Sequence, residues 1–276
     1  MESALDHRGA RALLEWYIDL GADECIQDSP VDRYTLPEVQ GYAGVKAPVA
    51  AAPAAARGAP PPLPVMAKVD AVAEAAAAAG AAADLSALRA AMEAFPHCDL
   101  KRGARNLVFS DGLPGARVMI IGEAPGREED QEGRPFVGSA GQLLDRMLAA
   151  IGLSRSAAEA DAAVYITNVL PWRPPQNRDP GPEEIAMLRP FLERHVALAR
   201  PDLLILMGNS SCDAVLGKRG ILRLRGHWTR ALGLPVMPMT HPAYLLRTPA
   251  AKREAWADLL EVRARLDAPL AAGEGV

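Results

Sequence analysis

The chain contains 276 residues, half of them apolar, which is enough for one sizeable α/β domain with an appendage. The net charge is −4, and the acidity is concentrated at the beginning, where residues 1–90 hold 12 acidic and 7 basic side chains. From Ala214 to Arg253 there are eight Lys or Arg residues and no Asp or Glu, a bias that suits phosphates but also occurs on an ordinary solvated face. The overall charge therefore does not exclude a nucleic-acid partner.

Neither a membrane span nor a secretory signal is predicted. No window of about eighteen uncharged apolar residues occurs, and the N-terminus has no basic segment leading into an apolar run. The three cysteines, Cys25, Cys98 and Cys212, are widely scattered, which argues against a disulfide framework or a CxxC metal site and favours reduced, buried thiols. We therefore expect a cytoplasmic monomer without a membrane contact.

The N-terminal region separates into two parts. Residues 1–46 form a helical extension, because residues 10–20 (ARALLEWYIDL) have apolar side chains at helical spacing. Such a helix can dock on the main domain or on a protein partner. Residues 47–68 are rich in Ala, Pro and Gly and are predicted to be a disordered linker. The folded domain then covers 69–276.

This domain is predicted to begin with an Ala-rich helical segment at residues 69–95, broken near Gly80 and restarted by Asp84 or Ser86 as a cap. Four apolar runs then predict buried strands at 117–121, 164–169, 203–207 and 235–239. Helical patterns alternate with them at 138–151, 182–199, 210–216 and 249–266. This alternation predicts a three-layer α/β/α sandwich with a central, mainly parallel four-stranded sheet.

Ligands of such folds bind at the carboxyl ends of the strands, and three segments there have distinctive sequences. The first is GEAPG at 122–126, followed by GRPFVG at 133–138. The second is YITN at 165–168 with RPPQNR at 173–178, and the third is HPAYLLR at 241–247. Taken singly, a Gly-rich turn, an Asn at a strand end or a lone His is more often structural.

Together, these motifs resemble family 4 of the uracil-DNA glycosylase superfamily in order and in spacing, over roughly residues 95–266. The resemblance implies that a uracil nucleotide is flipped out of DNA into a pocket. Phe136 would stack on the base and Asn168 would read its Watson–Crick edge, beside Ala124, which stands where other branches of the superfamily carry a catalytic Asp or Asn.

The resemblance also implies the catalytic groups. Cleavage of the glycosidic bond builds positive charge on the sugar and negative charge on the base. His241 would donate a hydrogen bond to the leaving base, and Glu123 would position or deprotonate water, with Asp130 as the second candidate. Further residues are expected to contact DNA, namely the wedge of Tyr244, Leu245 and Leu246, the backbone cation Arg247, and the helix starts at Ser139 and Ser210.

Two departures from the family refine this hypothesis. Typical members bind an iron–sulfur cluster through four cysteines, and the corresponding positions here are Phe95, Cys98, Trp172 and Leu188, so we expect no cluster and no other metal. A branch that traps uracil-DNA covalently uses a histidine in a long basic loop, and residues 169–177 contain neither. The sequence thus predicts a hydrolase that excises uracil and leaves an abasic site. The alternatives are a non-catalytic or trapping uracil-DNA-binding protein and a replication-associated scaffold.

Overall fold

The computed structural model of the chain describes residues 70–268. The helical extension expected at 1–46 and the linker expected at 47–68 lie outside the described residues. No helix among residues 70–268 combines the length and the apolar character needed to cross a membrane.

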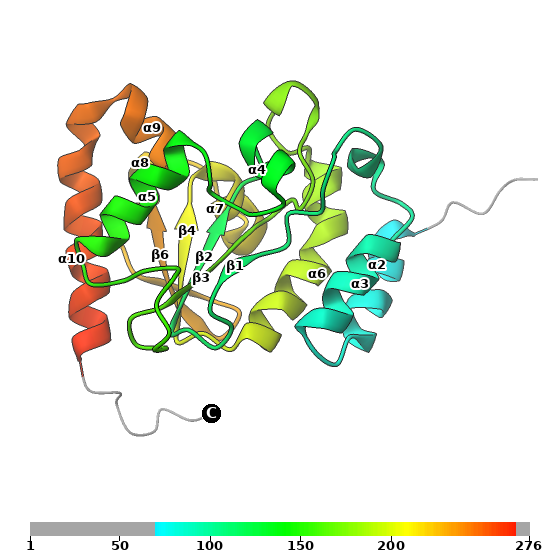
Figure 1. Cartoon of the computed structure of the whole chain (residues 1–276), viewed down its shortest axis with the longest axis horizontal. Coiled ribbons are helices and arrows are strands. Elements are labelled where there is room, and N and C mark those ends of the chain that lie inside the picture. Colours follow the sequence, from blue (N-terminus) through cyan, green and yellow to red (C-terminus); the bar gives the residue numbers. More distant parts are fainter. Residues whose placement is uncertain (1–69, 269–276) are drawn as a thin grey trace, which may run out of the picture. The chain divides into compact units, whose positions relative to one another are not determined.

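A six-stranded sheet forms the centre of the domain, with the strand order β1-β3-β2-β4-β6-β5 (Figure 1). The strands are β1 Asp111–Gly112, β2 Val118–Gly122, β3 Val164–Asn168, β4 Leu203–Met207, β5 Thr229–Ala231 and β6 Leu234–Met239. The four predicted strands are the central ones and are all parallel, whereas β1 and β5 pair antiparallel at the two edges. The expected four-stranded sheet is thereby corrected to six strands, because the two edge strands are too short to leave an apolar run in the sequence.

The register of the parallel strands aligns their carboxyl ends. Gly122 at the end of β2 pairs with Asn168 at the end of β3, and Met207 at the end of β4 pairs with Met239 at the end of β6. Every residue of β2, β3 and β4 is buried, so the strands consist of continuous apolar runs rather than alternating ones. All the strand-end motifs consequently lie at the same edge of the sheet.

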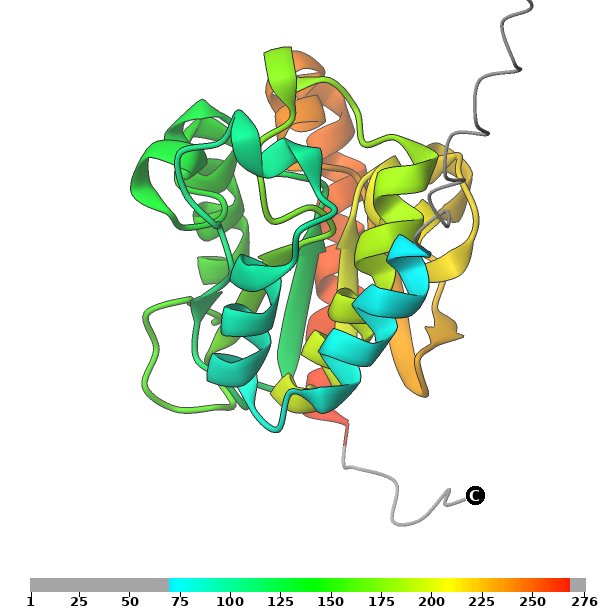
Figure 2. The same ribbon diagram turned by 90° about the vertical axis from the view of Figure 1, so that its right-hand side faces the viewer.

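Helices cover both faces of the sheet, which confirms the predicted three-layer sandwich. One apolar core joins alternate strand residues such as Ile120 and Ile205 to α5 (Ser139–Ala149) and α10 (Lys252–Asp267). The other core joins Met119, Leu206 and their neighbours to α6 (Pro182–Ala199) and α7 (Asn209–Leu216). Figures 1 and 2 show these two helical layers on either side of the strands.

The Ala-rich segment forms two helices, α2 (Ala71–Ala81) and α3 (Leu85–Ala94), which pack against α6 on its far side from the sheet (Figure 2). The predicted cap at Asp84 is confirmed, since its carboxylate accepts a hydrogen bond from the Ala87 N–H. Gly80 lies inside α2, and the chain leaves the helix one residue later. Arg194 of α6 donates two hydrogen bonds to the Ala82 carbonyl between the helices, which fixes this pair to the main domain.

Short helices occupy the connections that surround the carboxyl edge of the sheet. They are η1 Asp99–Arg102, α4 Arg127–Glu132, η2 Pro175–Asn177, α8 Ile221–Leu224, α9 Pro242–Arg247 and η3 Pro249–Ala251. The C-terminal helix expected at 249–266 is in fact η3 followed by α10.

Candidate active site

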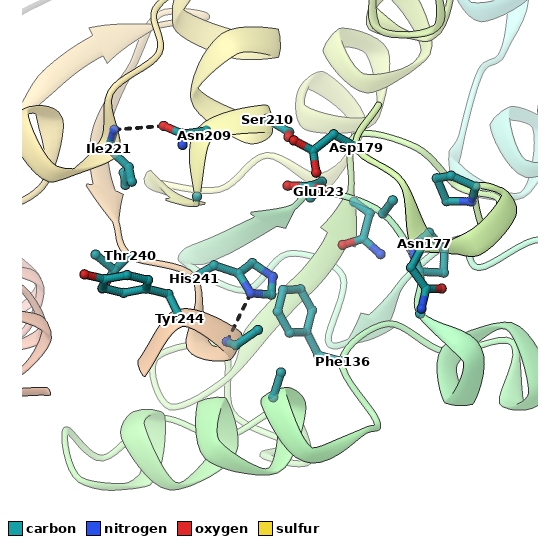
Figure 3. Close-up of a pocket in the computed structure, with 18 of the residues that line it drawn as sticks. Glu123, Phe136, Asn177, Asp179, Asn209, Ser210, Ile221, Thr240, His241 and Tyr244 are labelled. Atoms are coloured by element: carbon teal, nitrogen blue, oxygen red, sulfur yellow. Dashed lines mark hydrogen bonds between the residues drawn. The ribbon is translucent and has the colours of Figure 1, made fainter. Parts of the chain in front are cut away.

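A pocket of about 670 Å³ lies at the carboxyl edge of the sheet (Figure 3). The loops after β2, β3, β4 and β6 all contribute to it, as the alignment of the strand ends requires. The sequence-predicted residues that the structure brings together in its wall are Glu123, Ala124, Phe136, Asn168, Ser210, His241, Tyr244 and Arg247. The other four predicted residues, Asp130, Ser139, Leu245 and Leu246, are not part of the wall.

The loop after β2 is held in place by the Glu129 carboxylate. One oxygen accepts hydrogen bonds from the backbone N–H groups of Val137 and Gly138, each at 3.0 Å, and the other accepts one from Gly126, also at 3.0 Å. Glu129 therefore joins the two halves of the first motif. Its role was missed in the sequence, although the carboxylate three residues after Gly126, in the first turn of α4, follows the capping-box pattern.

Phe136 is held in a conformation that few residues adopt. Its backbone has φ of 54°, in the left-handed region, and its side chain is buried. The ring lies 5.4 Å from the His241 ring, with 27° between the two planes. Close approach is possible because Gly122 and Gly141 have no side chain: a Cβ atom on the first would overlap the Phe136 ring and one on the second would overlap its backbone.

Asn168 presents an unused amide to the pocket. It ends β3 and is only 6% exposed. Among residues 70–268, its side-chain amide makes no hydrogen bond to another protein group and faces the pocket, and the Thr240 hydroxyl in the same wall is buried without a partner. A buried polar group without a partner, such as the Thr240 hydroxyl, carries a cost of about 1–3 kcal/mol. A ligand that offers both a donor and an acceptor would satisfy the Asn168 amide.

His241 is fixed as a neutral hydrogen-bond donor. It is the N-cap of α9, and its Nδ1 accepts a hydrogen bond of 3.2 Å from the Ala243 N–H (Figure 3). Burial, together with the positive charge of Arg247, lowers the pKa of His241 to about 4, although the charge of Glu129 acts in the opposite direction. At neutral pH the imidazole is uncharged. Because Nδ1 carries the accepting lone pair, the single proton resides on Nε2.

Three carboxylates line the pocket, those of Glu123, Glu129 and Asp179, and the pKa of Glu123 is raised. Burial is the main cause of a raised pKa, and the negative charge of Asp179 raises it further, whereas contact with the Ser210 hydroxyl and the charge of Arg219 lower it. Figure 3 shows Glu123, Ser210 and Asp179 grouped on one side of the pocket. A carboxyl group that resists ionisation in this way is suited to accept a proton. Asp179 was not singled out in the sequence, where it is one charge in an exposed loop.

Asp130, the second candidate for water activation, serves a different purpose. Its carboxylate accepts hydrogen bonds from the Arg105 and Asn106 N–H groups at 2.8 and 3.1 Å, and it is buried away from the pocket lining. It anchors the segment before β1 to α4. The catalytic assignment of Asp130 is therefore corrected to a structural one.

The structure also changes which residues can form the expected wedge. Leu245 is 1% exposed and packs against Leu143 and Ala255, so it belongs to the core and cannot enter DNA. Leu246 is 41% exposed at the surface. The two leucines differ in exposure because neighbouring side chains of the helix α9 point in different directions. Ser139 is exposed at the start of α5, outside the pocket lining.

Asn209 has a structural role in the pocket rim. Its side-chain oxygen accepts hydrogen bonds from the Gly220 and Ile221 N–H groups at 3.0 and 2.8 Å (Figure 3). This contact ties the start of α7 to the start of α8, and Ile221 and Leu222 of α8 complete the wall. Nothing in the sequence distinguishes Asn209 from an ordinary helix-start residue.

An aromatic ring, an amide, an imidazole and carboxylates line one pocket at the carboxyl edge of an α/β sheet, an arrangement typical of an enzyme active site. Residues 109–260 match the family model of the uracil DNA glycosylase superfamily. The chain belongs to this superfamily.

Relatives in three organisms match the chain as well. The chain is 38% identical over 176 residues to the type-4 uracil-DNA glycosylases of Sulfurisphaera tokodaii and Archaeoglobus fulgidus, covering 60% of this chain in each case and 77% and 84% of the relative. It is 40% identical over 153 residues to that of Thermotoga maritima, covering 54% of this chain and 77% of the relative.

We predict that Glu129→Ala destabilises the domain, because three backbone N–H groups lose a charged acceptor. Hydrogen bonds to charged groups contribute about 1.5–3 kcal/mol each, and partial rehydration reduces the total, so we expect a loss of about 2–4 kcal/mol in the free energy of unfolding. Urea denaturation measures it. Glu128→Ala removes the same charge from an exposed neighbour and is the matched control. Equal stability of the two variants would contradict the assigned role.

Proposed function

We propose that this chain is a uracil-DNA glycosylase that hydrolyses the N-glycosidic bond of deoxyuridine in DNA and leaves an abasic site. The observation that carries the proposal is the pocket, in which the free Asn168 amide, the Phe136 ring and the His241 donor converge. The name shared by the type-4 relatives supports the same activity. All proposed catalytic groups lie within residues 69–276, which we propose as the catalytic domain.

The pocket supports selection of a flipped base. Phe136 offers a ring face for stacking, and the Glu129 carboxylate holds the backbone of the two residues that follow it. The Asn168 amide can donate to a base carbonyl and accept from the neighbouring ring N–H, a pairing that uracil satisfies and cytosine does not. Gly122 allows Phe136 and Asn168 to lie close together.

The chemistry is divided between two groups on different loops. As the bond between C1′ of the sugar and N1 of uracil breaks, its electron pair remains on the base. The Nε2–H of His241 then stabilises the negative charge on a base oxygen without transferring its proton. Glu123 orients the attacking water and accepts a proton from it as the water oxygen bonds to C1′.

Residues at the pocket rim are suited to contact DNA. Tyr244 and Arg247 line the rim, and Leu246 is exposed beside them. We propose that Tyr244 and Leu246 fill the space vacated by the flipped nucleotide and that Arg247 contacts the adjacent phosphate. Ser210 contacts Glu123, which supports a role in positioning that carboxylate as well as any contact with DNA.

The direct test is incubation with an oligonucleotide that contains one uracil, followed by alkali. Strand scission at the uracil is the expected result. A heat-stable protein–DNA adduct would instead identify a trapping protein, and the absence of both products would contradict any chemistry on uracil.

We predict that Glu123→Gln retains binding and lowers the single-turnover rate by about 10²–10⁴-fold, as expected for a general base. The pH profile provides a second readout. Because burial raises the pKa of Glu123 above the ordinary value for a Glu and the carboxylate is the active form, wild-type activity falls as the pH decreases through that raised pKa. The residual activity of Glu123→Gln should lack this acidic limb, and full activity or an unchanged profile would contradict the assignment.

We predict that Asn168→Asp lowers kcat/KM for uracil-DNA by at least about 10²-fold, because an ionised carboxylate cannot donate to a base carbonyl. Matched oligonucleotides with uracil or cytosine at one position measure the change. The ratio of uracil to cytosine removal should fall with it. An unaltered ratio, with unaltered uracil removal, would contradict the pocket assignment.

The iron–sulfur cluster implied by the family does not fit the residues at its corresponding positions. Phe95, Trp172 and Leu188 supply no thiolate, and all three are buried with Cys98 in one apolar core. Within residues 70–268, no group of three or more His, Cys, Asp or Glu side chains is placed to hold a metal ion. We propose that apolar packing at these positions takes the structural role of the cluster.

Two contacts support this replacement. The Phe95 ring meets the Phe191 ring edge-on, with centroids 5.3 Å apart, which joins the end of α3 to α6. The Lys101 ammonium donates to the Phe95 carbonyl at 2.8 Å and lies 5.4 Å from the centre of the Trp172 ring. The segment before the sheet is thus linked to the loop after β3 without metal.

We predict that Trp172→Ala lowers the free energy of unfolding by about 3–5 kcal/mol, as truncation of a large core aromatic does. Thermal or urea denaturation measures the loss. The purified wild-type protein should be colourless and free of iron. Stoichiometric iron with a visible absorbance band, or an unchanged stability of Trp172→Ala, would contradict the replacement of metal by packing.

A further inference from the structure

A second pocket, of about 360 Å³, lies along the outer edge of the sheet between α7, α8 and the β5–β6 hairpin. Its lining includes apolar residues such as Val215 and Leu224. Its basic side chains are Lys218, Arg223, His227 and Arg230, and no Asp or Glu lines it. The hairpin is at the edge of the sheet farthest from β1, and Figure 2 shows it as the orange antiparallel pair.

The cations of this pocket differ from their neighbours in lacking counter-charges. Within residues 70–268, Lys218, Arg223 and Arg230 have no carboxylate within 4.0 Å, and all three are exposed. Nearby Arg219 lies 3.6 Å from Asp213, and Arg225 is paired with the buried Asp258. Several like charges around one concavity repel each other and attract a polyanion.

The second pocket adjoins the candidate active site through α8. Ile221 and Leu222 line the active-site pocket, whereas Arg223 and Leu224 line the second. This short helix is held at both ends. Asn209 accepts hydrogen bonds from Gly220 and Ile221 at its start, and Arg225 at its end forms a hydrogen bond of 2.9 Å to Asp258 of α10. A strand with one base in the first pocket can therefore continue across a fixed surface into the second.

We propose that the second pocket binds the phosphates of the DNA strand that flanks the flipped uridine. The cations match a phosphodiester chain in sign, and their place beyond α8 matches its continuation from the active site. This inference rests on the proposed uracil-DNA glycosylase activity and extends its binding surface. It predicts that affinity depends on substrate length.

The test compares Arg223→Gln/Arg230→Gln with the wild type on uracil oligonucleotides of about five and about twenty nucleotides. The measured quantity is the protein concentration that gives the half-maximal single-turnover rate. For the longer DNA we expect this concentration to rise about tenfold. The slope of its logarithm against log salt should become shallower by about 1.4, corresponding to two lost phosphate contacts. For the shorter DNA the change should stay within about twofold.

The control is Arg189→Gln/Arg263→Gln, which removes the same charge from α6 and α10 at arginines paired with Glu193 and Asp267. An equal loss in this control, equal weakening on both substrate lengths, or an unchanged salt slope on the longer DNA would each overturn the proposal.

A separate measurement distinguishes failure of the second pocket from failure of the proposed function. If the wild type leaves uracil-DNA uncut, the proposed activity fails. Fluorescence anisotropy with thymine in place of uracil then still tests the pocket, because it reports the salt slope without cleavage. A shallower slope for Arg223→Gln/Arg230→Gln supports the phosphate site, and an unchanged slope overturns it.

Discussion

The hydrogen bond from the Ala243 N–H to Nδ1 of His241 is the interaction on which the proposed chemistry depends. It caps α9 and at the same time decides which ring nitrogen carries the proton. Burial keeps the imidazole neutral, so that the Nε2–H becomes a donor of fixed direction rather than an acid. A departing uracil anion needs such a donor, because a preoriented dipole stabilises new charge without reorganisation. The position of α9 after β6 brings this donor to the carboxyl edge of the sheet.

The remainder of the pocket is held in place by hydrogen bonds and close packing. Glu129 joins the loop after β2 to the Phe136 segment through three backbone hydrogen bonds, and Gly122 leaves space for Phe136 beside Asn168. The left-handed backbone of Phe136 stores strain that this surrounding structure must offset. The site thus gives up some stability in order to hold the pocket residues in a fixed geometry. In the same wall, the buried Thr240 hydroxyl has no hydrogen-bond partner among residues 70–268.

The sequence predicted the central strands, the main helices and most of the pocket, because continuous apolar runs and strand-end motifs are local signals. It did not reveal β1 and β5, whose few residues pair only through tertiary contact. It also did not distinguish the roles of Glu129 and Asp130, since adjacent carboxylates differ only in the direction in which α4 presents them. Leu245 and Leu246 raise the same difficulty, because burial on α9 depends on the helices packed against it.

The most direct test of this account is ¹⁵N nuclear magnetic resonance of the His241 ring in the free protein across a pH titration. We predict the tautomer with the proton on Nε2 and a pKa near the value of about 4 that burial imposes. Protonation at neutral pH, or a neutral ring with the proton on Nδ1, would contradict the central claim that His241 is a preset neutral donor to the leaving base.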